Sequence, residues 1–89
     1  MTDRRARAHR ARLDAVIALV DDSPYAQLDT LLIKAEHRAE LDGLTRTRLE
    51  ELLVEAVGEG SVQVRGSTRF RTYYTNTKRA TERLQELQQ

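Results

Sequence analysis

The sequence predicts a mainly α-helical domain that carries a two-stranded antiparallel β-hairpin, with its elements in the order α-α-α-β-β-α. Two observations lead to this fold class: apolar residues recur at helical spacing in three stretches before Gly60, and the period changes to two after it. The length of 89 residues fits one domain and leaves no room for two. Because so short a chain buries only a small core and has no cysteine for a disulfide, a homodimer is expected to add stability.

The first helix is predicted over residues 4–20, since its apolar residues share one stripe, formed by Leu13, Val16, Ile17 and Val20. Before Leu13 only alanines and one histidine separate the arginines, so this part has little to bury. Residues 1–12 are therefore interpreted as a basic N-terminal arm or a helical extension. Residues 13–89 are interpreted as a single helical domain.

The second helix is predicted to begin at the break Asp21-Asp22-Ser23-Pro24, where Ser23 caps it and Pro24 takes the first helical position. Asp42-Gly43 is expected to end it after about 18 residues, because glycine takes the left-handed conformation readily. One face of this helix is apolar and carries Leu28, Leu31, Leu32, Ala35 and Ala39.

The third helix is predicted to begin at Thr47, because Thr47 and Glu50 have the spacing of a capping box. Gly58-Glu59-Gly60 is expected to end it. Its apolar residues follow the i, i+3, i+4, i+7, i+8 pattern and are Leu49, Leu52, Leu53, Ala56 and Val57.

A β-hairpin is predicted over residues 61–75, where valines first alternate with polar residues and Gly66-Ser67 is expected to make the turn. One face of the returning strand then carries Phe70, Thr72 and Tyr74. The other face carries Arg69, Arg71 and Tyr73. Asn76 or Thr77 is expected to cap a last helix. The inner face of that helix carries Ala80, Leu84 and Leu87.

Charge is segregated along the chain, although the net charge is only +1. Residues 1–12 hold five arginines and one acid, residues 13–59 hold eleven acids and four bases, and residues 60–81 hold five bases and no acid. A basic face formed in this way attracts polyanions whatever the net charge of the chain. The alternative is that the basic ends bind the acidic middle, within one chain or across a dimer.

No catalytic motif is present, so the chain is predicted not to be an enzyme, and no cofactor is expected. It has no phosphate-binding glycine loop, no HExxH and no cysteine nucleophile, and no small-molecule substrate is evident. His37, with Glu36 and Glu40 nearby, is interpreted as an ordinary solvent-facing residue and not as a metal ligand. The longest apolar run, residues 15–20, is far shorter than the roughly 20 residues of a membrane helix, so no membrane partner and a cytoplasmic location are expected.

The hairpin arginines are the first candidates for a binding site. Arg65, Arg69 and Arg71 lie on or near a two-stranded ribbon, and such a ribbon can enter a DNA groove or lie along the phosphates. Each guanidinium group can donate two hydrogen bonds to one phosphate. The alternative is an exposed edge strand, on which arginines are solvated and discourage aggregation.

The end of the hairpin reads Arg71-Thr72-Tyr73-Tyr74-Thr75-Asn76-Thr77-Lys78-Arg79-Ala80, in which a basic residue and a Tyr-Tyr pair lead into the last helix. Through this string and the order of its elements, the chain resembles a winged helix-turn-helix domain with a wing similar to that of PadR-like regulators. The resemblance covers residues 45–87. It implies that the third helix is the recognition helix, with Thr45, Arg46 and Arg48 facing DNA. It also implies that the hairpin is the wing and that the last helix serves dimerisation.

The leading hypothesis is a small DNA-binding protein, a dimeric transcriptional regulator or accessory factor that docks electrostatically through its basic hairpin, with help from the arginine-rich N-terminus. Its candidate nucleic-acid-binding residues are Arg46, Arg48, Arg65, Arg69, Arg71, Lys78 and Arg79. Glu50, Glu51 and Glu55 lie on the third helix and would repel phosphates. An alternative interpretation is therefore that the hairpin binds DNA as a wing without a recognition helix. A hypothesis of another class is a non-catalytic protein–protein interaction or assembly subunit, for example of a virus-like particle. A third is RNA binding, since the aromatic residues of the hairpin can stack on bases.

Overall fold

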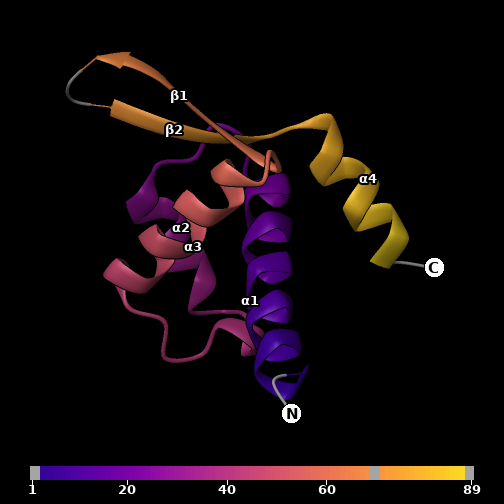
Figure 1. The fold of residues 1–89 in the computed structure, drawn as a ribbon. Coiled ribbons are helices and arrows are strands. Elements are labelled where there is room, and N and C mark those ends of the chain that lie inside the picture. Colours follow the sequence, from indigo (N-terminus) through magenta and orange to yellow (C-terminus); the bar gives the residue numbers. More distant parts are fainter. Residues whose placement is uncertain (1–2, 69–70, 88–89) are drawn as a thin grey trace.

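The computed structural model describes the backbone of residues 3–68 and 71–87, and the side chains of residues 4–66 and 74–87. The fold is mainly helical with one two-stranded antiparallel hairpin, so the predicted fold class and element order are confirmed (Figure 1). Its elements are α1 (Asp3–Asp22), α2 (Leu28–Ala35), the 3-10 helix η1 (Ala39–Leu41), α3 (Arg46–Gly58), β1 (Val62–Thr68), β2 (Arg71–Asn76) and α4 (Lys78–Leu87). Within the described residues, no helix combines the length and the apolar character needed to cross a membrane.

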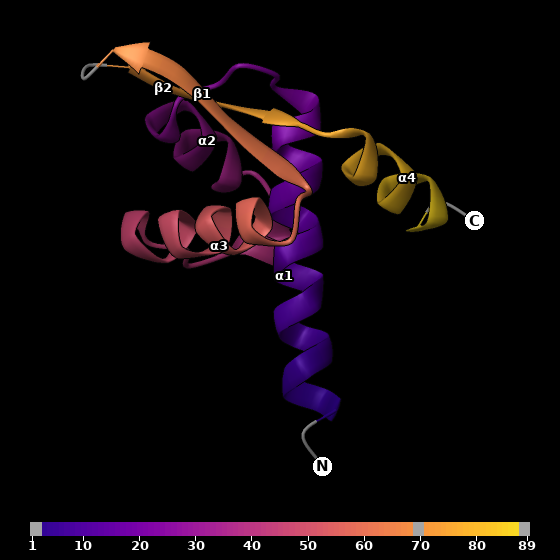
Figure 2. The ribbon, with the colours of Figure 1, turned by 45° about the horizontal axis from the view of Figure 1, so that its top comes forward.

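Helix α1 lies at the centre of the fold, with α2 and α3 on one side and α4 on the other (Figures 1 and 2). Its predicted apolar stripe is confirmed, since Val16, Ile17 and Val20 are fully buried. Burial also reaches Asp14 and Leu19, which lie outside that stripe, because neighbouring elements cover α1 on more than one side. Residues 3–12 continue the same helix toward the N-terminus.

The second helix begins later than predicted, at Leu28, so the prediction that Ser23-Pro24 begins it is wrong. The reason is pairing with a distant strand. The backbone N–H of Tyr25 donates to the carbonyl of Tyr74 (3.0 Å), and the N–H of Tyr74 donates to the carbonyl of Ala26 (2.9 Å). Tyr25 also has a left-handed φ of 62°, which interrupts a helix. The segment before α2 is therefore tied to β2 instead of forming a helical turn.

The second helix also ends earlier than predicted, and the third begins earlier. Helix α2 has 8 residues and ends at Ala35, after which the chain turns into η1, so the predicted continuation to Asp42 is wrong. The N-cap of α3 is Thr45, whose Oγ1 accepts a hydrogen bond from the N–H of Arg48 (3.1 Å), and the predicted cap at Thr47 is wrong. The predicted apolar stripe of α3 is confirmed by the complete burial of Leu49, Leu52, Leu53 and Ala56.

The hairpin spans nearly the predicted range 61–75, but its turn is not at the predicted position. The strands pair as far as Thr68 and Arg71, so Gly66-Ser67 lies within β1 and the turn predicted there is wrong. The register shifts between Arg65 and Thr68, and Gly66 has a φ of 138°. The conformational freedom of Gly66 therefore permits the irregular pairing of β1 with β2 at this point.

The base of the hairpin is fixed to the body of the molecule. Val62 is fully buried, and Tyr74 packs against the core. Thr77, one of the two predicted caps, begins α4, because its Oγ1 accepts from the N–H of Ala80 (3.3 Å) and donates to the carbonyl of Gly60 (2.5 Å). The other end of the ribbon projects from the body (Figures 1 and 2).

Candidate nucleic-acid interface

The candidate residues lie in three places. Arg46 and Arg48 are at the start of α3, Arg65 is in β1, and Lys78 and Arg79 begin α4. The start of α3 and the projecting end of the hairpin are on the same side of α1, whereas α4 is on the opposite side (Figures 1 and 2). The structure therefore brings the first two groups to one side and separates the third from them.

Of the hairpin arginines, the structure describes one side chain. Arg65 is exposed, and its Nη2 donates to Oε1 of Gln63 (3.1 Å), without a carboxylate partner among the described side chains. The backbone of Arg71 belongs to β2, but its side chain lies outside the described residues, as does all of Arg69. The predicted faces of the returning strand fall mostly on side chains 70–73, which also lie outside them.

The two arginines of α3 already have partners within the chain. Arg46 donates from Nη1 to a carboxylate oxygen of Asp29 in α2. Arg48 donates from Nη1 to Glu51 (3.0 Å) and from Nη2 to Nδ1 of His9 in α1 (3.3 Å). A phosphate would have to replace these partners before either guanidinium group could bind it.

The exposed face of α3 is acidic. Glu50, Glu51 and Glu55 are all exposed there, together with Val54. Carboxylates repel phosphates, so charge does not favour contact between this face and DNA. The winged-helix resemblance implies that α3 is the recognition helix, but the charges on the exposed face of α3 do not support that role.

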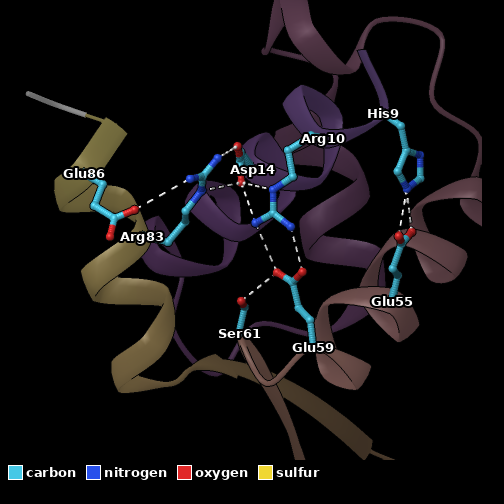
Figure 3. A network of polar contacts seen from close by, with 8 residues as sticks. All are labelled: His9, Arg10, Asp14, Glu55, Glu59, Ser61, Arg83 and Glu86. Carbon is cyan, nitrogen blue, oxygen red and sulfur yellow. Dashed lines mark hydrogen bonds and ion pairs between the residues drawn. The ribbon is translucent and has the colours of Figure 1, made fainter. Parts of the chain in front are cut away.

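A network of ion pairs joins α1 to the end of α3 and to α4 (Figure 3). Arg10 donates to both carboxylate oxygens of Glu59 (2.7 and 3.2 Å) and from Nε to Asp14 (3.0 Å). Arg83 of α4 donates to Asp14 from Nε (3.3 Å) and Nη2 (3.0 Å), and the Ser61 hydroxyl donates to Glu59 (2.7 Å). Asp14 is the buried centre of the network and is only 9 % exposed.

Hydrogen bonding within the network shifts the pKa values of its members. The hydrogen bond from Arg10 lowers the pKa of Glu59, against the opposing effect of burial, and the Ser61 hydroxyl lowers it further. The same bond raises the pKa of Arg10, and the bond to Asp14 raises the pKa of Arg83. All three shifts favour the charged forms of these side chains, so the ion pairs that join α1, α3 and α4 are between charged groups at neutral pH.

A polar hollow of about 460 Å³ opens beside this network. It is lined by Ser61 together with three arginines and three glutamates, which include the candidate residue Arg79. Because the charges balance, the hollow offers no net attraction to a polyanion. Lys78, beside Arg79, is exposed at the start of α4.

The charge that is segregated in the sequence is partly paired in the fold. Nε2 of His9 in α1 lies 2.7 Å from a carboxylate oxygen of Glu55 in α3, close to the Arg10–Glu59 pair (Figure 3). The alternative in which basic ends bind the acidic middle is thus realised in part within one chain. Reasoning from the sequence missed this network, although Asp14, an acid between Leu13 and the apolar run, lies four residues after Arg10 and was a signal for it.

Several exposed cations have no carboxylate partner among the described side chains. They are Arg4, Arg5, Arg7, Arg12, Lys34, Arg65, Lys78 and Arg79. Four of these eight lie in the N-terminal half of α1, the arginine-rich segment that was expected to help binding although its residues were not among the named candidates. The signal for them was the alternation of arginines with alanines over residues 4–12.

The part of the chain that the structure describes contains no group of three or more side chains arranged to hold a metal ion. No protein family, no curated protein and no solved structure matches the chain. The resemblance to a winged helix-turn-helix domain therefore rests on the residues quoted for it and on the order of the elements.

Proposed function

We propose that the chain is a small DNA-binding protein, a transcriptional regulator or accessory factor, that docks on duplex DNA through the hairpin of β1 and β2. The observation that carries the proposal is the hairpin itself, a ribbon that projects from the body (Figure 1). It belongs to a stretch, residues 60–81, with five bases and no acid. Such a stretch attracts phosphates even though the chain as a whole is nearly neutral.

The base of the ribbon is attached to the body of the molecule by buried Val62 and by the bridge between Ala26 and Tyr74. The major groove of B-DNA admits a two-stranded ribbon. Arg65 has no carboxylate to give up among the described side chains, and Arg69 with Arg71 adds two further charges.

Helix α3 has a minor role in this proposal. Arg46 and Arg48 are held by partners within the chain, and the exposed acids of α3 repel phosphates. The contacts are then mainly to the DNA backbone, and backbone contacts position a protein without reading sequence. The protein is therefore expected to bind unrelated duplexes with similar affinity. The element order and the short α2 support the resemblance to a winged helix-turn-helix domain, in which the hairpin is the wing.

Self-association through α4 is part of the same proposal. Ala80 is buried and Leu84 packs against the core, but Leu87 at the end of α4 is 50 % exposed. A second copy that covers Leu87 would form a two-fold symmetric dimer that carries two hairpins.

Fluorescence anisotropy of a labelled duplex tests the proposal. A hairpin variant with Arg65→Gln, Arg69→Gln and Arg71→Gln should reduce the slope of log affinity against log salt by about 3, since each phosphate contact contributes about 0.9. Lys34→Gln is the control, because Lys34 is also exposed and without a carboxylate partner among the described side chains, but lies in α2. It should leave the slope unchanged. Equal slopes for the wild type and the hairpin variant would contradict docking through the hairpin.

An assembly subunit is the second candidate function. Three large apolar side chains on three different helices favour it, because Ile33, Val54 and Leu87 are each at least half exposed. In a closed assembly, each of these side chains would be covered by a neighbouring subunit, whereas single exposed apolar residues are also common on monomers. Light scattering separates the two candidates: a closed assembly of defined size supports the subunit, and a monomer or dimer supports the DNA-binding protein.

A further inference from the structure

His9 joins α1 to α3 through both nitrogens of its imidazole ring. Nε2 lies 2.7 and 2.9 Å from the two carboxylate oxygens of Glu55 (Figure 3). Nδ1 lies 3.3 Å from Nη2 of Arg48, whose Nη1 donates to Glu51 (3.0 Å). We call these four residues the His9 bridge. Glu51, Arg48 and Glu55 belong to α3, so His9 is the member of the bridge that comes from α1.

The donors and acceptors of the bridge fix the protonation state of the ring. A guanidinium group has only donors, so Nδ1 of His9 must be an unprotonated acceptor to receive the hydrogen bond from Arg48. An ionised carboxylate has only acceptors, so Nε2 carries the hydrogen and donates it to Glu55. The ring in this arrangement is therefore neutral, with its hydrogen on Nε2.

Addition of one proton changes the two contacts of the ring in opposite directions. On a protonated ring, Nδ1–H faces the guanidinium group of Arg48, which has no acceptor, and two positive charges lie next to each other. That contact is then lost, whereas the contact with Glu55 becomes an ion pair between opposite charges. Arg48 keeps its pair with Glu51, but that carboxylate is 58 % exposed and holds the guanidinium group only weakly.

The other charged groups around His9 do not change charge in the range in which histidine does. From α3 these groups are the three other members of the bridge, and one turn away along α1 they are Arg5 and Arg12. Carboxylates ordinarily titrate near pH 4 and arginine above about pH 12, whereas histidine ordinarily titrates between about pH 5 and pH 8. The imidazole is thus the member of the bridge through which a change of pH in that range acts.

We propose that His9 is a pH-sensitive switch, in which protonation of the imidazole releases Arg48 from α1. Its consequence rests on the proposed function: the released guanidinium group, in the first turn of α3, becomes available to a DNA phosphate. This turn lies on the side of α1 from which the hairpin projects (Figures 1 and 2). Protonation also pairs Glu55, one of the exposed acids of α3, so repulsion of phosphates by this helix decreases at the same time. DNA affinity therefore increases as the pH falls.

NMR spectroscopy of the whole chain between about pH 5.5 and pH 8 tests the switch without DNA. At the upper end, the ring nitrogens of His9 should show the tautomer with hydrogen on Nε2. As the pH falls, the guanidinium signal of Arg48 should change with the same midpoint as the imidazole of His9. Arg46 is the internal control, because it lies in the same turn but is bound to Asp29, and its signal should not follow that midpoint. A hydrogen on Nδ1, or an Arg48 signal that does not change with His9, would overturn the switch.

Variants of α3 test the coupling in the reverse direction, because linkage is reciprocal. Arg48→Gln removes the cation that opposes the proton, so the titration midpoint of His9 should rise by about 0.7 unit, the effect of one charge at about 4 Å in water. Glu55→Gln removes the carboxylate that favours the proton and should lower the midpoint. Glu50→Gln is the matched control and should leave it unchanged, because Glu50 is exposed on the same helix but is not a partner of His9. An unchanged midpoint in Arg48→Gln would overturn the switch.

Salt titrations on one DNA duplex test the consequence for binding. Between about pH 8 and pH 5.5, the slope of log affinity against log salt should become steeper by about 0.9 in the wild type, the contribution of one phosphate contact. His9→Gln keeps a donor and an acceptor but cannot take up the proton, so it should show one slope at both pH values. Arg48→Gln should also show one slope. His37→Gln is the matched control and should keep the change, because His37 is the other histidine of the chain and is exposed.

The outcomes separate this inference from the proposed function. If the wild type binds DNA with one slope at both pH values, Arg48 is not released to DNA and the inference is overturned, while docking through the hairpin stands. If the wild type binds no DNA at low salt but Arg48 changes with His9 in the NMR titration, the proposed function fails and the switch stands as a property of the fold. Circular dichroism checks that the variants keep their helix content. Should His9→Gln unfold, the comparison of Arg48 with Arg46 in the wild type still decides the matter.

Discussion

Replacement of Asp14 by asparagine perturbs a buried carboxylate through which α1 holds α4. The aspartate accepts three hydrogen bonds from two guanidinium groups, at 3.0 to 3.3 Å, and its side chain is 11 % exposed. Hydrogen bonds to charged groups contribute about 1.5–3 kcal/mol each. Because the Arg10 and Arg83 side chains are 36 % and 34 % exposed, water screens part of this energy. We therefore expect Asp14→Asn to lower the free energy of unfolding by about 2–3 kcal/mol.

Urea denaturation followed by circular dichroism measures this change, and Tm should fall by about 10–20 °C. The control is Asp29→Asn, which removes the ion pair with Arg46 at a carboxylate that is 69 % exposed and should cost less than about 1 kcal/mol. A double-mutant cycle of Asp14→Asn with Arg83→Gln should give a coupling energy of about 1 kcal/mol or more. If Asp14→Asn costs no more than Asp29→Asn, or if the coupling is near zero, the ion pair does not hold α4 in place.

Two further changes test the polar network and the strained turn. Acid should destabilise the protein through Glu59, whose pKa Arg10 holds below its ordinary value of 4.5 in the folded state. This stabilisation is fully present above the pKa of the unfolded state and is lost as the pH falls through the pKa of the folded state. Glu59→Gln should therefore make the free energy of unfolding fall less steeply as the pH is lowered. An unchanged pH dependence would contradict the Arg10–Glu59 pairing. Tyr25→Gly should raise the unfolding free energy by up to about 1 kcal/mol, because glycine adopts the left-handed φ of 62° without strain. A lower Tm for Tyr25→Gly would contradict this backbone conformation.

Local spacing predicted the helices α1 and α3 because both bury a stripe that recurs within a few residues. The start of α2 could not be predicted in this way. Ser23-Pro24 has the local chemistry of a helix start, but the backbone of Tyr25 and Ala26 pairs with Tyr74, which is about fifty residues further along the chain. The turn at Gly66-Ser67 was wrong for a related reason, since glycine permits an irregular strand as readily as a turn.

The candidate interface was predicted in its composition but not in its pairing. Counting charges identified the basic hairpin and the basic N-terminus. It could not show that Arg46 lies against Asp29, or that Arg48 contacts His9, because these pairs depend on how α3 packs on α2 and α1. Packing also determines which arginines retain no carboxylate partner among the described side chains. That distinction shifts the proposed DNA contacts from α3 to the hairpin.

The dependence of DNA affinity on salt tests the central claim most directly. Anisotropy titrations of the wild type on two unrelated duplexes of two turns should give similar affinities. They should also give a slope of log affinity against log salt of about −3, from the three hairpin arginines. The hairpin variant should reduce that slope by about 3. No binding at low salt, or a slope that is the same with and without the three hairpin arginines, would contradict the account.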